Sequence, residues 1–137
     1  MTHFNFPIRV YYEDTDAGGV VYYANYLKFM ERARTEMLRD RNLEQDVLRQ
    51  QYGVVFAVRH AEIDYINAAR FNDLLQVSVE IIKLGKASIT VAQTICRHHE
   101  PDDLLCRATI KVACVSADAF RACAIPDNIR MELSRVN

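Results

Sequence analysis

The chain has 137 residues, of which 50% are hydrophobic and 26% charged, enough for one globular domain with a proper core. Its formal net charge of −1 provides no overall field that would attract nucleic acid or an anionic membrane. No apolar run approaches the ~20 residues that span a bilayer, and residues 1–7 lack the basic and apolar regions of a signal peptide. We therefore expect one cytoplasmic domain over residues 1–137.

The first predicted element is a short strand, residues 8–12, in which apolar and polar side chains alternate. An acidic, glycine-containing turn follows, with Asp14 and Asp16 before Gly18 and Gly19. Glycines let the backbone approach a ligand closely, and the first turn of a helix offers unpaired N–H donors at its positive end. A carboxylate beside such donors is a nucleophile or base facing an oxyanion site, which is the arrangement that acyl transfer needs.

The period changes at about Ala24, where apolar residues begin to recur at helical spacing. The pattern predicts an amphipathic helix of three to four turns with these residues on its buried face: Tyr26, Phe29, Met30, Ala33 and Met37. Charged residues of the same segment have the spacing of an ion-pair network at the surface or at an interface: Glu31, Arg32, Arg34 and Glu36. A less regular segment with some helical character, residues 42–51, leads to Gly53.

After Gly53 the sequence has β character. Alternating patterns predict four strands, around residues 55–63, 77–81, 89–95 and 108–114. Turn residues separate them at 67–73, 84–86 and 100–103, and a short helix is predicted at 127–133. Such alternation indicates an antiparallel sheet with one covered face. The fold class is therefore α+β, with an antiparallel sheet wrapped around one long central helix.

The stretch around the acidic turn resembles a known family. Residues 9–22, together with Asn25, Tyr26 and residues 31–36, resemble the hotdog-fold acyl-CoA thioesterases. The likeness is strongest to the branch associated with the Tol–Pal cell-envelope system and to the 4-hydroxybenzoyl-CoA thioesterases. It implies a hotdog fold, active sites at the interface of a dimer with paired sheets, assembly of dimers into a homotetramer, and a link to the cell envelope.

The resemblance places the catalytic carboxylate at Asp16 and the oxyanion donor at the backbone N–H of Tyr23. A carboxyl group with an ordinary pKa of about 3.9 is ionised at neutral pH. It would attack the thioester carbonyl or take a proton from water, and both roles stay open. A thiol leaving group with a pKa of about 8.5 needs little help from a general acid.

Other site residues follow from the same comparison. Gly18 and Gly19 would allow close approach of the substrate, and Asn25 would support the turn or cap the helix. Lys86, in a turn before a strand, would meet the coenzyme A phosphates. The Tol–Pal branch usually has His where this chain has Tyr23, so that ring is either a platform for an aromatic acyl group or simply a packed side chain.

Three other interpretations of the acidic turn compete with catalysis. A polar turn without chemistry suits Asp and Gly. A calcium loop starting at Asp14 would have Asn25 in place of its bidentate Glu. A phosphatase of the haloacid dehalogenase type needs strand–helix alternation that is absent after residue 53. Asp14 itself is predicted to be structural.

Neither cysteines nor histidines indicate a metal site. The four cysteines lack C-x-x-C spacing and are predicted to be buried apolar residues: Cys96, Cys106, Cys114 and Cys123. His98 and His99 lie beside a polar turn. We expect neither a metal nor a redox cofactor.

The sequence therefore predicts an enzyme that hydrolyses a short-chain or aromatic acyl-CoA to the free acid and coenzyme A. One alternative is a non-catalytic hotdog module that binds acyl carrier protein or an envelope-assembly partner. Another is hydration of an enoyl thioester, a hotdog chemistry whose working pair includes a His that this stretch lacks. Acyl carrier protein is also a conceivable carrier of the substrate, and no nucleic-acid partner is expected.

Overall fold

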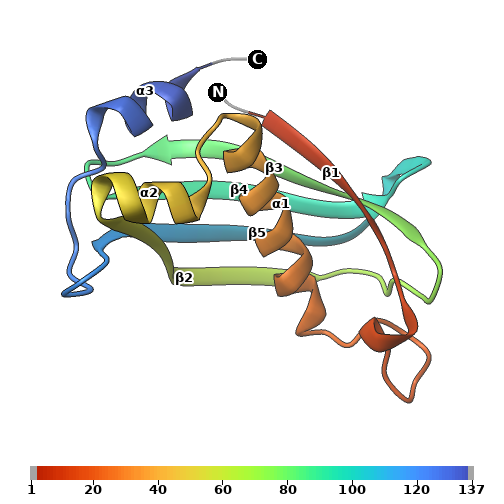
Figure 1. The fold of residues 1–137 in the computed structure, drawn as a ribbon. Coiled ribbons are helices and arrows are strands. Elements are labelled where there is room, and N and C mark those ends of the chain that lie inside the picture. Colours follow the sequence, from red (N-terminus) through yellow and green to blue (C-terminus); the bar gives the residue numbers. More distant parts are fainter. Residues whose placement is uncertain (1–2, 136–137) are drawn as a thin grey trace.

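The structure, a computed structural model, describes residues 3–135. Its elements are β1 (His3–Arg9), a 3₁₀ turn (Tyr12–Asp14), α1 (Asn25–Asp40), α2 (Gln45–Tyr52), β2 (Val54–Tyr65), β3 (Leu74–Leu84), β4 (Ser88–Arg97), β5 (Glu100–Ser116) and α3 (Asp127–Ser134). The five strands form one antiparallel sheet in the order β1-β3-β4-β5-β2 (Figure 1). Within residues 3–135 no helix combines the length and hydrophobicity needed to cross a membrane.

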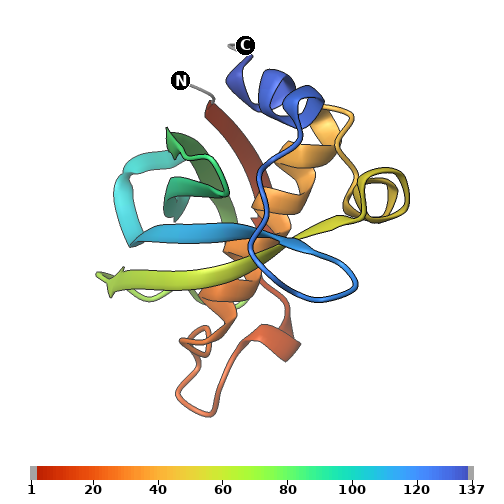
Figure 2. The ribbon, with the colours of Figure 1, turned by 90° about the vertical axis from the view of Figure 1, so that its left-hand side faces the viewer.

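The curved sheet wraps around α1, as predicted (Figure 2). Every residue of the predicted apolar helix face is at most 3% exposed. The helix ends where Asn42 takes a left-handed conformation with φ of 61°, and the Leu43 N–H donates back to the Leu38 carbonyl at 2.7 Å. The helix contacts β3 and β1, so it covers that half of the concave sheet face.

The predicted alternation in β3 and β4 is confirmed. Leu75, Val77, Val79 and Ile81 are fully buried against α1, while the residues between them are half-buried or exposed. Gln93 is the polar exception on this face of β4, at 1% exposure. Its burial leaves neither amide atom without a partner. The side-chain N–H donates to Met30 O at 3.1 Å, and the side-chain oxygen accepts from the Arg34 guanidinium at 2.9 Å.

Two predicted boundaries are wrong. The first strand covers His3–Arg9 rather than residues 8–12, because the Asp14 carboxylate accepts the Tyr11 N–H and folds residues 12–14 into a 3₁₀ turn. The predicted turn at 100–103 lies inside β5, whose first residue, Glu100, pairs with Arg97. The register shifts there by bulges, which accommodate Pro101 without interrupting the strand.

The predicted ion-pair network on α1 does not form at the surface of the single described chain, and its formation at an interface stays a prediction. Of its four members only Glu36 forms an ion pair, with Arg39. Arg34 instead turns inward to Gln93, and Arg32 lies 6.0 Å from the ring centroid of Phe29. The remaining predictions for α2 and the C-terminal helix are confirmed within a few residues, and the turn lies at His98–His99 itself rather than beside it.

Strand β2 lies at one edge of the sheet. Its alternation is weaker in sequence because the register with β5 shifts between Val58 and His60, at a bulge. Beyond Val54 most of its side chains are half-buried or exposed. Helix α2 packs on β2, and beside it two hollows stay open between α1 and β2.

Candidate active site

The acidic segment forms a tight hairpin between the 3₁₀ turn and α1. The Gly19 N–H donates to Asp16 O at 3.0 Å, and the Asp16 N–H donates to Val20 O at 2.9 Å. Thr15 and Val21 pair as an isolated antiparallel bridge. Gly19 has φ of 80°, which a residue with a side chain adopts only under strain. The sequence therefore presents Asp16 at the start of a hairpin turn that requires this glycine.

The Asp16 carboxylate is exposed, and one of its oxygens is held in place. Oδ1 accepts the Gly18 N–H at 2.8 Å. A Cβ at Gly18 would lie 3.1 Å from the same oxygen, so the absence of a side chain there leaves room for the carboxylate. A fixed and exposed carboxylate is suited to attack a carbonyl carbon or to take a proton from water.

Asp14 has a structural role, as predicted. Its carboxylate is 8% exposed and accepts the Tyr11 N–H at 2.8 Å. Its carbonyl accepts the Tyr22 N–H and the Asn25 side-chain amide, both at 2.9 Å. Asn25 thus supports the turn from within the helix. The alternative of helix capping is wrong, since Ala24 is the N-cap residue and no side chain caps it. That Asn25 contacts substrate stays a prediction.

The amino terminus of α1 offers donors beside this turn. Among residues 3–135, neither the Tyr23 N–H nor the Ala24 N–H donates a hydrogen bond. These groups stand at the positive end of the helix dipole, and the first turn of α1 contains no acidic residue that would neutralise it. An oxyanion formed near this end would find free donors.

Aromatic rings surround the start of α1. The Tyr23 ring is 61% exposed and meets Tyr65 edge-on, with ring centroids 5.9 Å apart. Tyr65 also lies 5.7 Å from Tyr26, whose hydroxyl accepts the buried Ala69 N–H at 3.0 Å. These rings line a hollow of about 320 Å³. Burial raises the pKa of Tyr26 and of Tyr65, so both stay neutral at physiological pH.

Sequence reasoning missed Tyr65. It ends a strand 42 positions after Tyr23 in the chain, and only the pairing of β2 with β5 brings it to the start of α1. An aromatic residue at the end of a predicted strand was the only available signal.

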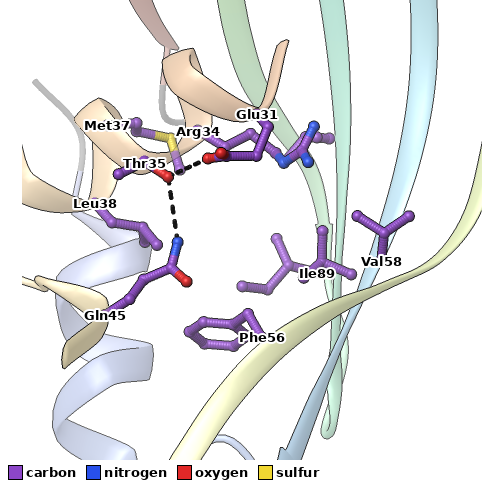
Figure 3. A pocket seen from close by; sticks show the side chains of 11 residues that line it. Glu31, Arg34, Thr35, Met37, Leu38, Gln45, Phe56, Val58 and Ile89 are labelled. Atoms are coloured by element: carbon purple, nitrogen blue, oxygen red, sulfur yellow. Dashed lines mark hydrogen bonds between the residues drawn. The ribbon is translucent and has the colours of Figure 1, made fainter. Parts of the chain in front are cut away.

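A second region lies between α1 and β2. Two adjoining hollows of about 370 and 600 Å³ share Glu31, Arg34 and Val58. Together they form what we call the α1–β2 groove. Its floor is apolar and comes from helices and strands on both sides: Leu38, Phe56, Val58, Ile89, Val91 and Val112 (Figure 3). A pocket of this size and lining suits an apolar ligand.

One wall of the α1–β2 groove is polar. Thr35 donates to the Glu31 carboxylate, and the Gln45 amide donates to the Thr35 hydroxyl at 3.3 Å (Figure 3). Arg34 also lines the groove, and burial lowers the pKa of its guanidinium.

The groove runs along α1 from Leu27 and Lys28, in its first turn, to Leu38 near its end, so the part that adjoins Leu38 lies away from the Asp16 turn. Thr35 is roughly 15 Å along the helix axis from Asn25, given 1.5 Å per residue. Lys86 is farther still, since it follows β3, whose first residue Leu74 pairs with Arg9 near the acidic turn (Figure 1). Within one chain, therefore, the structure brings Asp16, Gly18, Gly19, Tyr23 and Asn25 together, and it does not bring Lys86 to them.

Comparison with known proteins gives a consistent picture. A family model described as the thioesterase superfamily matches residues 18–106, a match that starts two positions after Asp16. An acyl-CoA thioesterase named YbgC from Haemophilus influenzae is 46% identical over 127 residues, covering 93% of this chain and 91% of that protein. An acyl-CoA thioester hydrolase of the same name from Escherichia coli is 41% identical, with 98% of both chains covered.

The fold has solved counterparts as well. A crystal structure of a 4-hydroxybenzoyl-CoA thioesterase in complex with 4-hydroxybenzoyl-CoA superposes with a TM-score of 0.89, covering 98% of this chain and 100% of that one. The two sequences are 18% identical, so this similarity establishes the hotdog fold alone.

Proposed function

The chain belongs to the thioesterase superfamily, and on this basis we propose that it hydrolyses acyl-CoA thioesters to a free acid and coenzyme A through the carboxylate of Asp16. The observation that carries the assignment is the geometry of the turn. Asp16 is exposed and held by the Gly18 N–H, in the turn that leads to α1, and the N–H groups of Tyr23 and Ala24 just before that helix donate no hydrogen bond among the described residues. A polar turn without chemistry also forms the bond to Gly18, so the free N–H groups beside the carboxylate are what favour catalysis.

The proposed mechanism uses few groups. The substrate carbonyl lies against the Tyr23 N–H, which stabilises the negative charge that develops on its oxygen; loss of one such donor typically costs about 3 kcal/mol. On one route Asp16 attacks the carbonyl carbon, the C–S bond breaks as the mixed anhydride forms, and water then hydrolyses the anhydride to the free acid and the Asp16 carboxylate. On the other route Asp16 removes a proton from the water that attacks the carbonyl, and the C–S bond breaks as the tetrahedral intermediate collapses. On both routes the thiolate of coenzyme A departs. Its low basicity explains why no further acid is required.

We further propose that the working site contains two copies of the chain. The hollow at Tyr23 and Tyr65 beside the start of α1 has a volume of about 320 Å³, whereas the apolar floor of the α1–β2 groove lies toward Leu38 and Phe56. A symmetric dimer, formed through the open edge at β2, would place the turn of one copy over the groove of the other. The acyl group would then occupy the groove while the thioester meets Asp16.

The quaternary and cellular assignments are proposals on the same basis. The resemblance of residues 9–36 supports a cytoplasmic homotetramer linked to the Tol–Pal envelope system. It also supports a role for Lys86, contributed by another copy, at the coenzyme A phosphates. Light scattering tests the tetramer, and co-purification with Tol–Pal components tests the link.

Lys86→Gln should raise KM for acyl-CoA but not for the acyl-pantetheine, which lacks the nucleotide.

The experiment that tests the function is thiol release from a panel of short-chain, long-chain and aromatic acyl thioesters. Each acyl group is offered on coenzyme A and on acyl carrier protein, which identifies the carrier. We expect turnover of at least one short-chain or aromatic acyl-CoA and a loss of at least a hundredfold in kcat in Asp16→Asn, the usual effect of removing a catalytic base.

Asp102→Asn is the matched control, because Asp102 is an exposed aspartate on β5 with no side-chain bond among the described residues. It should retain wild-type activity. Equal rates for wild type and Asp16→Asn on every thioester, with both proteins folded, would contradict the assignment and favour the non-catalytic binding module.

A further inference from the structure

Two of the four cysteines face one another outside the site described above. Cys114, on β5, and Cys123, in the segment before α3, have their sulfur atoms 3.8 Å apart. The backbone explains their proximity. Val115 and Ala122 form an antiparallel bridge, which places Cys114 directly opposite Cys123, and the Cys123 N–H donates to Cys114 O at 3.0 Å.

We propose that Cys114 and Cys123 are a modification site at which a peroxide or a small-molecule disulfide converts the dithiol into an intramolecular disulfide. The geometry permits it without unfolding. Directly opposed residues of antiparallel strands have Cα atoms ~4.5–5.5 Å apart, inside the range that disulfides span. Starting from 3.8 Å, the sulfur atoms must approach by about 1.8 Å to reach a bond of ~2.05 Å, within the reach of side-chain rotation.

The accessibility of the two thiols sets the order of events. Cys123 is partly exposed, whereas Cys114 is buried, and burial together with the contact to Cys123 raises the pKa of the Cys114 thiol to about 12. Hydrogen peroxide therefore oxidises Cys123 first, giving a sulfenic acid and one water. The Cys114 sulfur then attacks the sulfenic sulfur; the S–S bond forms, the S–O bond breaks, and the thiol proton leaves with the hydroxyl as a second water. Each sulfur loses one electron and the peroxide gains two.

The other cysteines provide an internal comparison. Neither Cys96 nor Cys106 has another sulfur within contact distance among the described residues, and the Cys96 thiol lies against Gln76 O at 3.9 Å instead. Burial raises the pKa of both thiols as well. If oxidation were governed by chance collisions in an unfolded chain, all four cysteines would react alike. Reaction in the folded chain should be confined to the opposed pair.

The site is also placed to affect the fold. The 114–123 hairpin joins the end of β5 to the segment that leads to α3, and Ile125 N–H continues the contact by donating to Lys86 O at 2.9 Å. A disulfide would close this short loop and reduce the conformational freedom of the unfolded chain. Oxidation should therefore raise the thermal unfolding midpoint, by roughly 9 °C for a loop of this length.

The test is peroxide treatment of the folded, full-length protein, followed by alkylation of free thiols and tryptic digestion. Trypsin separates the four cysteines, since Arg97, Lys111 and Arg121 lie between successive ones and Arg107 follows Cys106. We expect a linked pair of peptides, residues 112–121 and 122–130, two hydrogen masses lighter than their sum, with Cys96 and Cys106 still alkylated. Cys123→Ser should abolish both the linked pair and the rise in unfolding midpoint.

Three outcomes would overturn the proposal. All four cysteines could remain alkylated at every peroxide dose that leaves the protein folded. Cys123 could advance to the sulfinic acid without linking to Cys114. Disulfides could instead involve Cys96 or Cys106 as often as Cys114. Because the readout is peptide mass and unfolding temperature, none of these results depends on thioesterase activity.

Discussion

At Gly18 the absence of a side chain keeps the Asp16 carboxylate in its position. A Cβ built there lies 3.1 Å from Asp16 Oδ1, closer than such contacts normally are, while the Gly18 N–H must still reach the same oxygen at 2.8 Å. Gly18 therefore supports Asp16 Oδ1 in two ways: its N–H donates a hydrogen bond to that oxygen, and the absence of a side chain leaves room for it.

We predict that Gly18→Ala lowers kcat by about tenfold, because displacement of a catalytic group by a fraction of an ångström weakens its alignment. The thermal unfolding midpoint should change little, since Gly18 is exposed and has no left-handed conformation. Steady-state kinetics and a thermal melt measure the two effects. A Gly18→Ala protein with wild-type kcat would show that the carboxylate does not need this support.

Individual site residues could be predicted from the sequence where they are neighbours in the chain. Asp16, Gly18 and Gly19 are neighbours in the chain, so their shared turn could be predicted from residue types. Tyr65 could not be predicted, because its place beside Tyr23 depends on the pairing of distant strands. The same holds for Lys86, whose distance from Asp16 within one chain follows only from the length and direction of β3.

Two glycines with positive φ lie where an element ends or a turn connects two elements. Substituting them distinguishes an effect on stability from an effect on catalysis. Gly19 in the hairpin has φ of 80° and Gly53 at the end of α2 has φ of 66°, and an added Cβ would meet nothing within 4 Å at either position. Alanine at either site therefore acts through backbone strain alone.

We predict that Gly19→Ala and Gly53→Ala each lower the free energy of unfolding by about 1 kcal/mol, the cost of a left-handed residue with a side chain. Only Gly19→Ala should also reduce kcat, because the strained hairpin relaxes around Asp16. Denaturant unfolding and thiol release distinguish them. Equal losses of activity in both variants would mean that general destabilisation, rather than the turn, limits catalysis.

Element boundaries were less predictable than element types. The helix α1 and the strands β3 and β4 carry strong periodicity, and their burial agrees with it. The ends of β1 and the start of β5 were wrong because single contacts decide them. The Asp14 carboxylate captures the Tyr11 N–H, and bulges let β5 run through Pro101.

For the whole molecule, buried thiols make stability depend on alkaline pH. Burial raises the pKa of Cys106 from 9.0 to about 12 and raises the pKa of Tyr26 as well. Above pH 9 the unfolded chain releases the Cys106 proton while the folded chain retains it, so the folded state binds more protons and stability falls as pH rises toward 12.

We predict that the free energy of unfolding is unaffected by this thiol below pH 9 and that the thiol accounts for a loss of about 1 kcal/mol by pH 10. Urea unfolding at pH 8 and pH 10 measures the change. Cys106→Ala should reduce the slope, since it removes the titrating group. A slope that is the same in wild type and Cys106→Ala would contradict the assignment.

The α1–β2 groove belongs to this largest scale, and the sequence alone did not reveal it. Leu38, Phe56 and Ile89 come from three elements, and their periodicity predicts burial rather than a pocket. The groove lies between α1 and β2, and it depends on how the helix packs on the sheet. Its apolar floor at Leu38 and Phe56 lies toward the end of α1 away from Asp16, which leads to the central claim that one copy supplies the carboxylate and another the groove.

Mixing two inactive variants tests that claim most directly. Asp16→Asn removes the carboxylate, and Val58→Trp fills the groove at a side chain that is 53% exposed and lines both of its hollows. After co-refolding, with the dimer verified for each variant alone, a mixed dimer has one complete site and one doubly defective site. Random pairing should restore about a quarter of wild-type activity. No recovery in a mixture shown to contain mixed dimers would contradict the shared site and place the acyl pocket within the chain that carries Asp16.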